Sequence, residues 1–249
     1  MKQLKSWSLL LGAWLCCAAA QVDNVKAALA NLNLGTAYYK NGELAFAKEK
    51  LERARTQDPK NAQVHGVLGL LYSSLGDEAK ADASFKTSLR LAPADPDLLN
   101  NYAVYLCSHG SVDEGVRRFE LAATNVLYKT PWAAYTNAGR CLRDGKRSSE
   151  AAALYDKALK SLPTFAEAIY QYADLELELN QPAAALKRVE TFVNYSPAPS
   201  ADLLLTGWKA ARALGDQLTA IKYARRLQMD YRDSDQARAV IGGAGSVGR

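Results

Sequence analysis

Apolar residues fall at helical spacing in two short runs within residues 62–95. A glycine at position 76 separates the runs, because glycine is a poor residue for a helix interior. Tyr72 lies on the apolar face of the first run and Phe85 on that of the second, and Pro93 ends the second run. This pattern predicts a helical hairpin whose two helices share an apolar seam.

The same pattern repeats along most of the chain at a step of 34 residues, which widens to 36 between Ala103 and Gly139. The positions that keep the step are Gly35, Gly69 and Ala103; Ala47 and Ala81; Leu51, Phe85 and Phe119; Pro59 and Pro93; Gly139, Ala173 and Gly207; and Pro163 and Pro197. A 34-residue helix–turn–helix period of this kind is the signature of the tetratricopeptide repeat. The sequence therefore predicts an all-α fold, a right-handed superhelical solenoid of about six helical hairpins.

The period also predicts how the chain is divided. We expect residues 1–20 to be a signal peptide and residues 21–27 a short lead. A capping helix and a flexible, glycine-rich tail are expected over residues 235–249. The hairpins are expected at residues 28–61, 62–95, 96–129, 132–165, 166–199 and 200–233.

The N-terminal segment has the features of a secretory signal peptide. Two lysines are followed by an uncharged apolar run that ends in alanines just before Gln21, and this run is too short to span a membrane. Cleavage before Gln21 is the first alternative. The second is lipidation at Cys16 or Cys17, for which the preceding Trp14-Leu15 pair fits poorly.

Charge adds little to this picture. The full chain carries 31 Lys and Arg against 26 Asp and Glu. Without residues 1–20, which contain two lysines, the balance is 29 against 26, a formal charge of +3. The charges are interspersed along the predicted helices, whereas a nucleic-acid-binding protein concentrates basic residues on one face. We therefore expect no nucleic-acid partner.

Two cysteines remain after residue 20, and they lie on the first helices of the third and fourth hairpins. Because first helices of neighbouring repeats pack side by side, Cys107 and Cys141 can come within bonding distance. Export to an oxidising compartment favours a disulfide, which would join the two hairpins that flank the 36-residue step. The alternative is a pair of buried, reduced thiols.

The sequence offers no recognisable catalytic or cofactor chemistry. The two histidines, His65 and His109, are far apart and lack the neighbours of a metal site. Glycine-rich phosphate loops and nucleophile elbows are absent from the sequence. Asp174, Glu176 and Glu178 alternate on one helix, and we expect them to diverge around its axis. The sequence predicts a protein that is not an enzyme and needs no cofactor.

Two stretches carry a more specific signal, NNYAVYLC at residues 100–107 and NAGRC at residues 137–141. They resemble the type IV pilus biogenesis and stability proteins, a pilotin-like lipoprotein family of Gram-negative bacteria, and the resemblance covers most of the chain. It implies a non-catalytic scaffold that helps the pilus secretin reach the outer membrane and form multimers. It also implies a periplasmic location, with membrane attachment only through an N-terminal lipid.

We expect such a scaffold to act by presenting a groove to a segment of its partner. Stacked first helices line a concave face, and a partner segment lies against it. A generic periplasmic adaptor for other cell-envelope complexes is the alternative function, and it predicts the same fold. The residues expected to project into the groove are Tyr39, Leu70, Asn100, Val104, Arg140, Tyr170 and Trp208.

Overall fold

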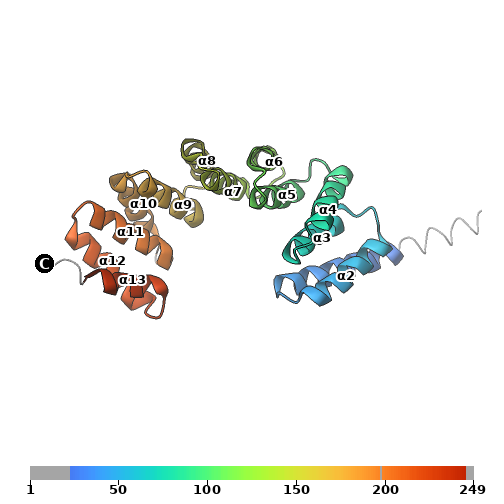
Figure 1. The fold of residues 1–249 in the computed structure, drawn as a ribbon, viewed down its shortest axis with the longest axis horizontal. Coiled ribbons are helices and arrows are strands. Elements are labelled where there is room, and N and C mark those ends of the chain that lie inside the picture. Colours follow the sequence, from blue (N-terminus) through green and yellow to red (C-terminus); the bar gives the residue numbers. More distant parts are fainter. Residues whose placement is uncertain (1–22, 197, 245–249) are drawn as a thin grey trace, which may run out of the picture. The chain divides into compact units, whose positions relative to one another are not determined.

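The computed structural model describes residues 23–196 and 198–244. Within these residues the chain forms thirteen helices and no strand, so the all-α prediction is confirmed (Figure 1). The N-terminal helix covers residues 23–40. The others are α2 (Leu44–Gln57), α3 (Ala62–Ser74), α4 (Glu78–Leu91), α5 (Pro96–Ser108), α6 (Val112–Thr124), α7 (Pro131–Asp144), α8 (Ser148–Ser161), α9 (Ala166–Glu178), α10 (Pro182–Tyr195), α11 (Ala201–Ala213), α12 (Gln217–Asp230) and α13 (Asp235–Ala244).

The chain divides into two compact units, of which the first ends at Leu106 and the second begins at Cys107. In the first unit, α3 packs against α2 and forms a hairpin with α4. In the second unit, the hairpins α7–α8, α9–α10 and α11–α12 follow one another, and α9 contacts both α7 and α11. The first helices of these hairpins are therefore neighbours, as the repeat predicts.

Small residues at the 34-residue step allow the two helices of a hairpin to approach closely. A Cβ atom added to Gly69 would lie 2.7 Å from Cδ1 of Phe85, and one added to Gly139 would lie 2.6 Å from Cε1 of Tyr155. Real Cβ atoms do not come this close to other heavy atoms, so a larger residue would push the helices apart. The pairing of a small residue with an aromatic ring thus fixes the hairpin geometry.

Caps and turns end the helices where the sequence places polar residues. The Asn61 side chain accepts hydrogen bonds from the backbone N–H groups of Gln63 and Val64, which caps the start of α3. The turn after α3 uses Gly76 at a φ of 73°. The turn after α7 uses Lys146 at a φ of 62° instead, a conformation that favours glycine.

Aromatic residues fill the seams of both units. In the first unit, the Phe85 ring lies 5.2 Å from the rings of both Tyr102 and Tyr105. In the second unit, buried Tyr155 lies 5.7 Å from the Tyr172 ring. Helix α13 packs against α11 and α12 and buries Val240, so it closes the last hairpin.

Near both ends of the described residues, the helices run further than the repeat pattern predicts. The segment expected as a lead is helical from residue 23 onward, and α13 extends into the glycine-rich segment as far as Ala244. The 36-residue step falls on the connection between α6 and α7, where Val126 and Leu127 are 96% and 81% exposed. The expected signal peptide, Cys16 and Cys17 lie outside the described residues.

Candidate functional site

The seven residues expected to line a groove all lie on first helices, but they belong to two units that are described separately. The first unit holds four of them, on the N-terminal helix, α3 and α5. The second unit holds three, on α7, α9 and α11. The structure brings them together only within each unit, and the two sets are as follows: Tyr39, Leu70, Asn100 and Val104 in the first, and Arg140, Tyr170 and Trp208 in the second.

The set in the first unit combines a polar bridge with modest apolar exposure. The Tyr39 hydroxyl lies 3.1 Å from Oγ of Ser74, so it links the N-terminal helix to α3. Leu70 and Asn100 are half-buried, and Val104 is 37% exposed. These four side chains offer a surface that mixes apolar contact with one amide.

The set in the second unit consists of one exposed side chain and two half-buried aromatic ones. Arg140 is exposed, whereas Tyr170 and Trp208 are half-buried against the core of the last hairpins. The Arg212 guanidinium lies 5.0 Å from the centre of the Trp208 ring, a cation–π distance. Burial raises the pKa of Tyr170, and the carboxylates of Asp174 and Asp202 raise it further. Tyr170 therefore presents a neutral hydroxyl.

Sequence reasoning missed the strongest polar feature of this face, an arginine network between α7 and α9. Arg143 Nη2 donates to Asp174 Oδ2 at 2.5 Å and to Glu178 Oε1 at 2.6 Å, and Arg143 Nε donates to Glu178 Oε2 at 3.0 Å. Its Nη1 donates to Gln171 Oε1 at 3.1 Å. The arginine side chain is 15% exposed, so these bonds fix it in place.

The network corrects one expectation from the sequence. Asp174 and Glu178 do not diverge, because residues four apart share a helix face, and both bind Arg143. Only Glu176 points the other way. The hydrogen bond from Arg143 lowers the pKa of Glu178, so this carboxylate stays ionised. The signal in the sequence was the four-residue spacing of the two acids, together with an arginine at the end of the preceding first helix.

Glu176 takes part in a second ion pair, on the opposite side of α9. Its two carboxylate oxygens accept hydrogen bonds from Arg188 of α10, at 3.0 Å from Nε and 2.6 Å from Nη2. The guanidinium carbon of Arg188 lies 3.7 Å from the centre of the Tyr172 ring. Burial opposes the charge on Arg188, but the ion pair outweighs it and raises the arginine pKa.

Comparison with known proteins gives the same architecture. A tetratricopeptide repeat family matches residues 32–96 and 108–164. The crystal structure of PilW, a widely conserved type IV pilus biogenesis factor, has a TM-score of 0.73 and 27% identity, covering 86% of this chain and 98% of PilW. The chain therefore contains tetratricopeptide repeats and has their helical fold.

A second relative is a pilus assembly protein. The type IV pilus assembly protein PilF of Pseudomonas aeruginosa is 24% identical over 202 residues, which cover 81% of this chain and 80% of PilF. A solved PilF structure has a TM-score of 0.71 at 23% identity, covering 89% of this chain and 99% of that one. The protein is thus related to type IV pilus biogenesis proteins.

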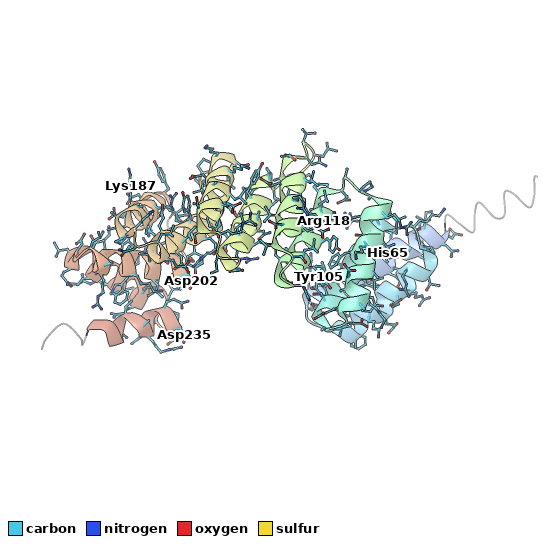
Figure 2. The ribbon with its side chains drawn as sticks, turned by 45° about the horizontal axis from the view of Figure 1, so that its top comes forward. His65, Tyr105, Arg118, Lys187, Asp202 and Asp235 are labelled. Atoms are coloured by element: carbon cyan, nitrogen blue, oxygen red, sulfur yellow. A yellow bond between two sulfur atoms is a disulfide. The ribbon has the colours of Figure 1, made fainter. Side chains whose placement is uncertain are left out.

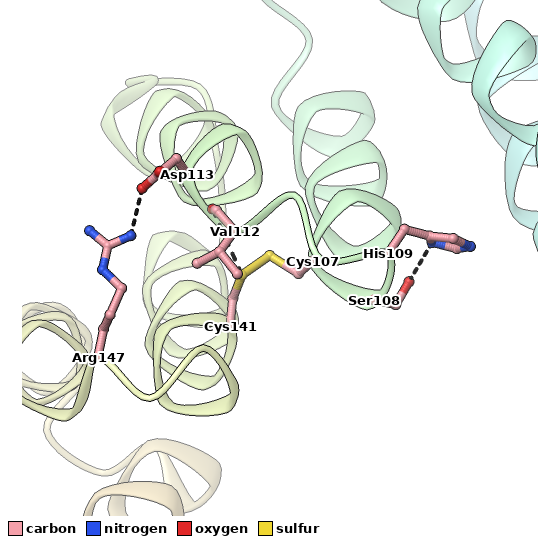
Figure 3. The surroundings of a disulfide bond; sticks show 7 residues. All are labelled: Cys107, Ser108, His109, Val112, Asp113, Cys141 and Arg147. Atoms are coloured by element: carbon pink, nitrogen blue, oxygen red, sulfur yellow. Dashed lines mark hydrogen bonds and ion pairs between the residues drawn. A yellow bond between two sulfur atoms is a disulfide. The ribbon is translucent and has the colours of Figure 1, made fainter.

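The structure places the two cysteines of this repeat protein in a disulfide (Figure 3). Both belong to the second unit, and their sulfur atoms are 2.00 Å apart with Cα atoms 5.6 Å apart. Beside the disulfide, Arg147 Nη1 donates to Asp113 Oδ1 at 2.5 Å. The bridge therefore stands next to an ion pair that also joins the region of α6 to that of α8.

The histidines take local roles. Nε2 of His65 lies 2.9 Å from the carbonyl oxygen of Pro59, and Nδ1 of His109 lies 3.1 Å from Oγ of Ser108. Among residues 23–196 and 198–244, no group of three or more His, Cys, Asp or Glu side chains can hold a metal ion. Within the same residues, no helix is long and apolar enough to cross a membrane.

Proposed function

We propose that this protein is a non-catalytic scaffold for type IV pilus biogenesis, which assists the outer-membrane localisation and multimerisation of the pilus secretin. The observation that carries the proposal is the likeness to PilW, which spans 98% of that chain at 27% identity. The PilF match, over 81% of this chain, supports the same process. The partner is a protein, and the role requires no cofactor.

The two faces described above are the proposed contact surfaces. On the second unit, Trp208 and Tyr170 supply broad apolar contact, and exposed Arg140 supplies a positive charge. Aromatic residues and arginine carry much of the binding energy at protein interfaces. The Arg143 network stiffens the floor of this surface, which lowers the entropy cost of binding. On the first unit, Asn100 contributes a half-buried polar side chain to the proposed surface.

We further propose that the protein works in the periplasm, with or without an N-terminal lipid that anchors it to the inner leaflet of the outer membrane. The support is the signal-like residues 1–20 and the cysteines at positions 16 and 17. Intact mass of the protein from membrane and soluble fractions measures this directly. A chain that starts at Gln21 has no lipid, whereas an acyl mass on a cysteine identifies the anchor.

Deletion of the gene, followed by gel analysis of the secretin, tests the proposed function. We expect the ratio of heat-stable secretin multimer to monomer to fall, together with surface piliation. Because the proposed surfaces lie on separate units, Asn100→Ala and Arg140→Ala are tested singly and together. Lys86→Ala is the control, since Lys86 is exposed on a second helix and its i,i+4 pair with Asp82 is worth only about 0.3–0.5 kcal/mol.

Two results would contradict parts of the proposal. An unchanged multimer ratio in the deletion strain removes the secretin role and favours a general cell-envelope adaptor. A ratio that falls in the deletion strain but not in the double variant keeps the role and removes the chosen residues. Helicity and the thermal midpoint of each variant are measured alongside, so that loss of folding is recognised.

A further inference from the structure

The second unit carries a cavity on the side of α9 away from the Arg143 network. Helix α10 supplies most of its lining, Leu159 comes from α8, and α9 forms its floor; its volume is about 550 Å³. Leu159, Ile169 and Phe192 give it an apolar lining, and Tyr195, which is 79% exposed, stands at one end. Cavities of this size with an apolar lining and a few polar groups are typical of binding sites. We call it the α8–α10 groove.

The equivalent position one repeat earlier carries two longer side chains, Lys157 and Tyr135. There, Lys157 of α8 reaches across to Glu120 of α6, with Nζ 2.9 Å from Oε1. The same ammonium lies 5.7 Å from the centre of the Tyr135 ring. At the 34-residue step, Thr191 replaces Lys157 and Ile169 replaces Tyr135. Two shorter side chains therefore stand at this position of the α8–α10 groove.

The floor of the groove is also unusual for this fold. Glu176 and Arg188 correspond, at the same step, to Leu142 and Leu154 of the preceding repeat. Those leucines are buried, and Glu176 is buried as well, with 4% of its surface exposed. Burying an ion pair costs more free energy than burying two leucines of similar size, so the fold itself does not need the pair. The pair gives the groove a polar floor.

Charge at the rim selects the kind of ligand. Lys187 is exposed on α10 beside the groove (Figure 2). Within the part of the chain that the structure describes, no hydrogen bond or ion pair involves its ammonium group. Both oxygens of Glu176 are occupied by Arg188. The uncompensated charge among the lining residues is thus positive, and it complements a carboxylate.

We propose that the α8–α10 groove binds a short helical segment of a partner polypeptide, in which a large apolar side chain enters the cavity and a neighbouring carboxylate pairs with Lys187. An amphipathic helix that lays its apolar face in a hydrophobic groove is a common mode of peptide recognition. This surface is separate from the first-helix faces assigned to the proposed pilus role. It goes beyond that role, because the acidic segment can belong to any partner.

Binding of defined peptides to the full chain tests this inference. The probes are short fluorescein-labelled peptides that carry one apolar anchor (Leu, Phe or Trp) flanked by Glu, Gln or Lys, and fluorescence anisotropy reports binding. We expect the Glu series to bind about threefold to fivefold more tightly than the Gln series, the range of an exposed ion pair. The Lys series binds most weakly. Lys187→Glu should reverse the order of the Glu and Lys series.

Two variants close the groove, and one matched variant leaves it open. Thr191→Phe and Ala184→Trp each place an aromatic ring at the rim of the cavity, where both positions line it. Each should weaken the Glu series about tenfold or more. Ala183→Trp adds the same ring at the adjacent exposed position, which does not line the cavity, and should bind as the wild type does. Helicity of all variants at 222 nm checks that each one folds.

The outcomes distinguish between a peptide, a fatty acid and a second copy of this chain as the molecule that occupies the groove. Absence of binding by every peptide, or equal loss in Ala183→Trp and Ala184→Trp, overturns the proposal. Tight binding of decanoate without peptide binding overturns it in favour of a fatty acid. A concentration-dependent dimer in sedimentation velocity that Ala184→Trp abolishes overturns it in favour of a second copy of this chain. None of these results depends on the secretin assay, so the two proposals fail separately.

Discussion

The buried pair of Glu176 and Arg188 allows a sharp test of how this fold is stabilised. Replacing one partner by leucine leaves the other charge inside the repeat without its two hydrogen bonds. Replacing both by leucine copies the composition of the preceding repeat, where Leu142 and Leu154 occupy these positions. The three variants Glu176→Leu, Arg188→Leu and the double form a complete cycle.

The expected magnitudes follow from the exposure of each charge. The Glu176 side chain is 6% exposed, so Arg188→Leu leaves a buried carboxylate and should cost about 3–5 kcal/mol of unfolding free energy. The Arg188 side chain is 23% exposed and water can reach it, so Glu176→Leu should cost less, about 2–3 kcal/mol. The double variant should lie between unchanged and about 4 kcal/mol more stable than the wild type.

Urea denaturation followed by helicity at 222 nm measures the cycle, with Lys187→Leu as an exposed control that should change stability by less than about 0.5 kcal/mol. The coupling energy between the two sites is the quantity of interest. If both single variants lie within about 1 kcal/mol of the wild type, the pair is not buried in the way described. If the double variant loses as much unfolding free energy as the two single variants together, breaking the ion pair is not the cause of that loss.

Two further predictions concern the disulfide and the buried tyrosines. Peptide mapping without reduction should find Cys107 linked to Cys141, and Cys107→Ala together with Cys141→Ala should lower the unfolding free energy by about 3–4 kcal/mol, as expected for cysteines 34 residues apart; two free thiols in the mapping would contradict this. Burial raises the pKa of Tyr72, Tyr155 and Tyr223 from 10.0 to about 12. The neutral phenols are thus favoured in the fold, and their contribution to stability should be complete below pH 10 and lost as the pH rises toward 12. Absorbance at 295 nm should show ionisation coinciding with loss of helicity, and ionisation near pH 10 in the folded chain would refute the reasoning.

The repeat made the helices predictable, because its small residues have a direct steric purpose. Gly69 and Gly139 stand where a Cβ atom would collide with an aromatic ring of the partner helix. A step of 34 residues between such positions therefore fixes where each hairpin lies. The same reasoning placed Cys107 and Cys141 on neighbouring first helices, close enough for the bridge that the structure contains.

The polar contacts were harder to predict, since they depend on which faces of different repeats meet. Arg143 finds Asp174 and Glu178 at sequence separations of 31 and 35, and no local motif joins residues so far apart. The helix spacing of the two acids was available in the sequence, but their common partner was not. The 34-residue period also gave no sign that the chain divides into two units. This division separates the seven expected groove residues into two sets.

A repeat protein carries its own reference, because each position can be compared with the same position in the next repeat. Where the neighbouring repeat has buried apolar residues, as at Leu142 and Leu154, the fold is satisfied without special chemistry. Where one repeat instead buries an ion pair and shortens the residues above it, as at Glu176 and Thr191, the fold gains no stability that its neighbours lack. Such a departure needs another cause, and an apolar groove beside the exposed Lys187 supplies one. The stability cycle and the peptide experiment examine the two halves of that argument independently.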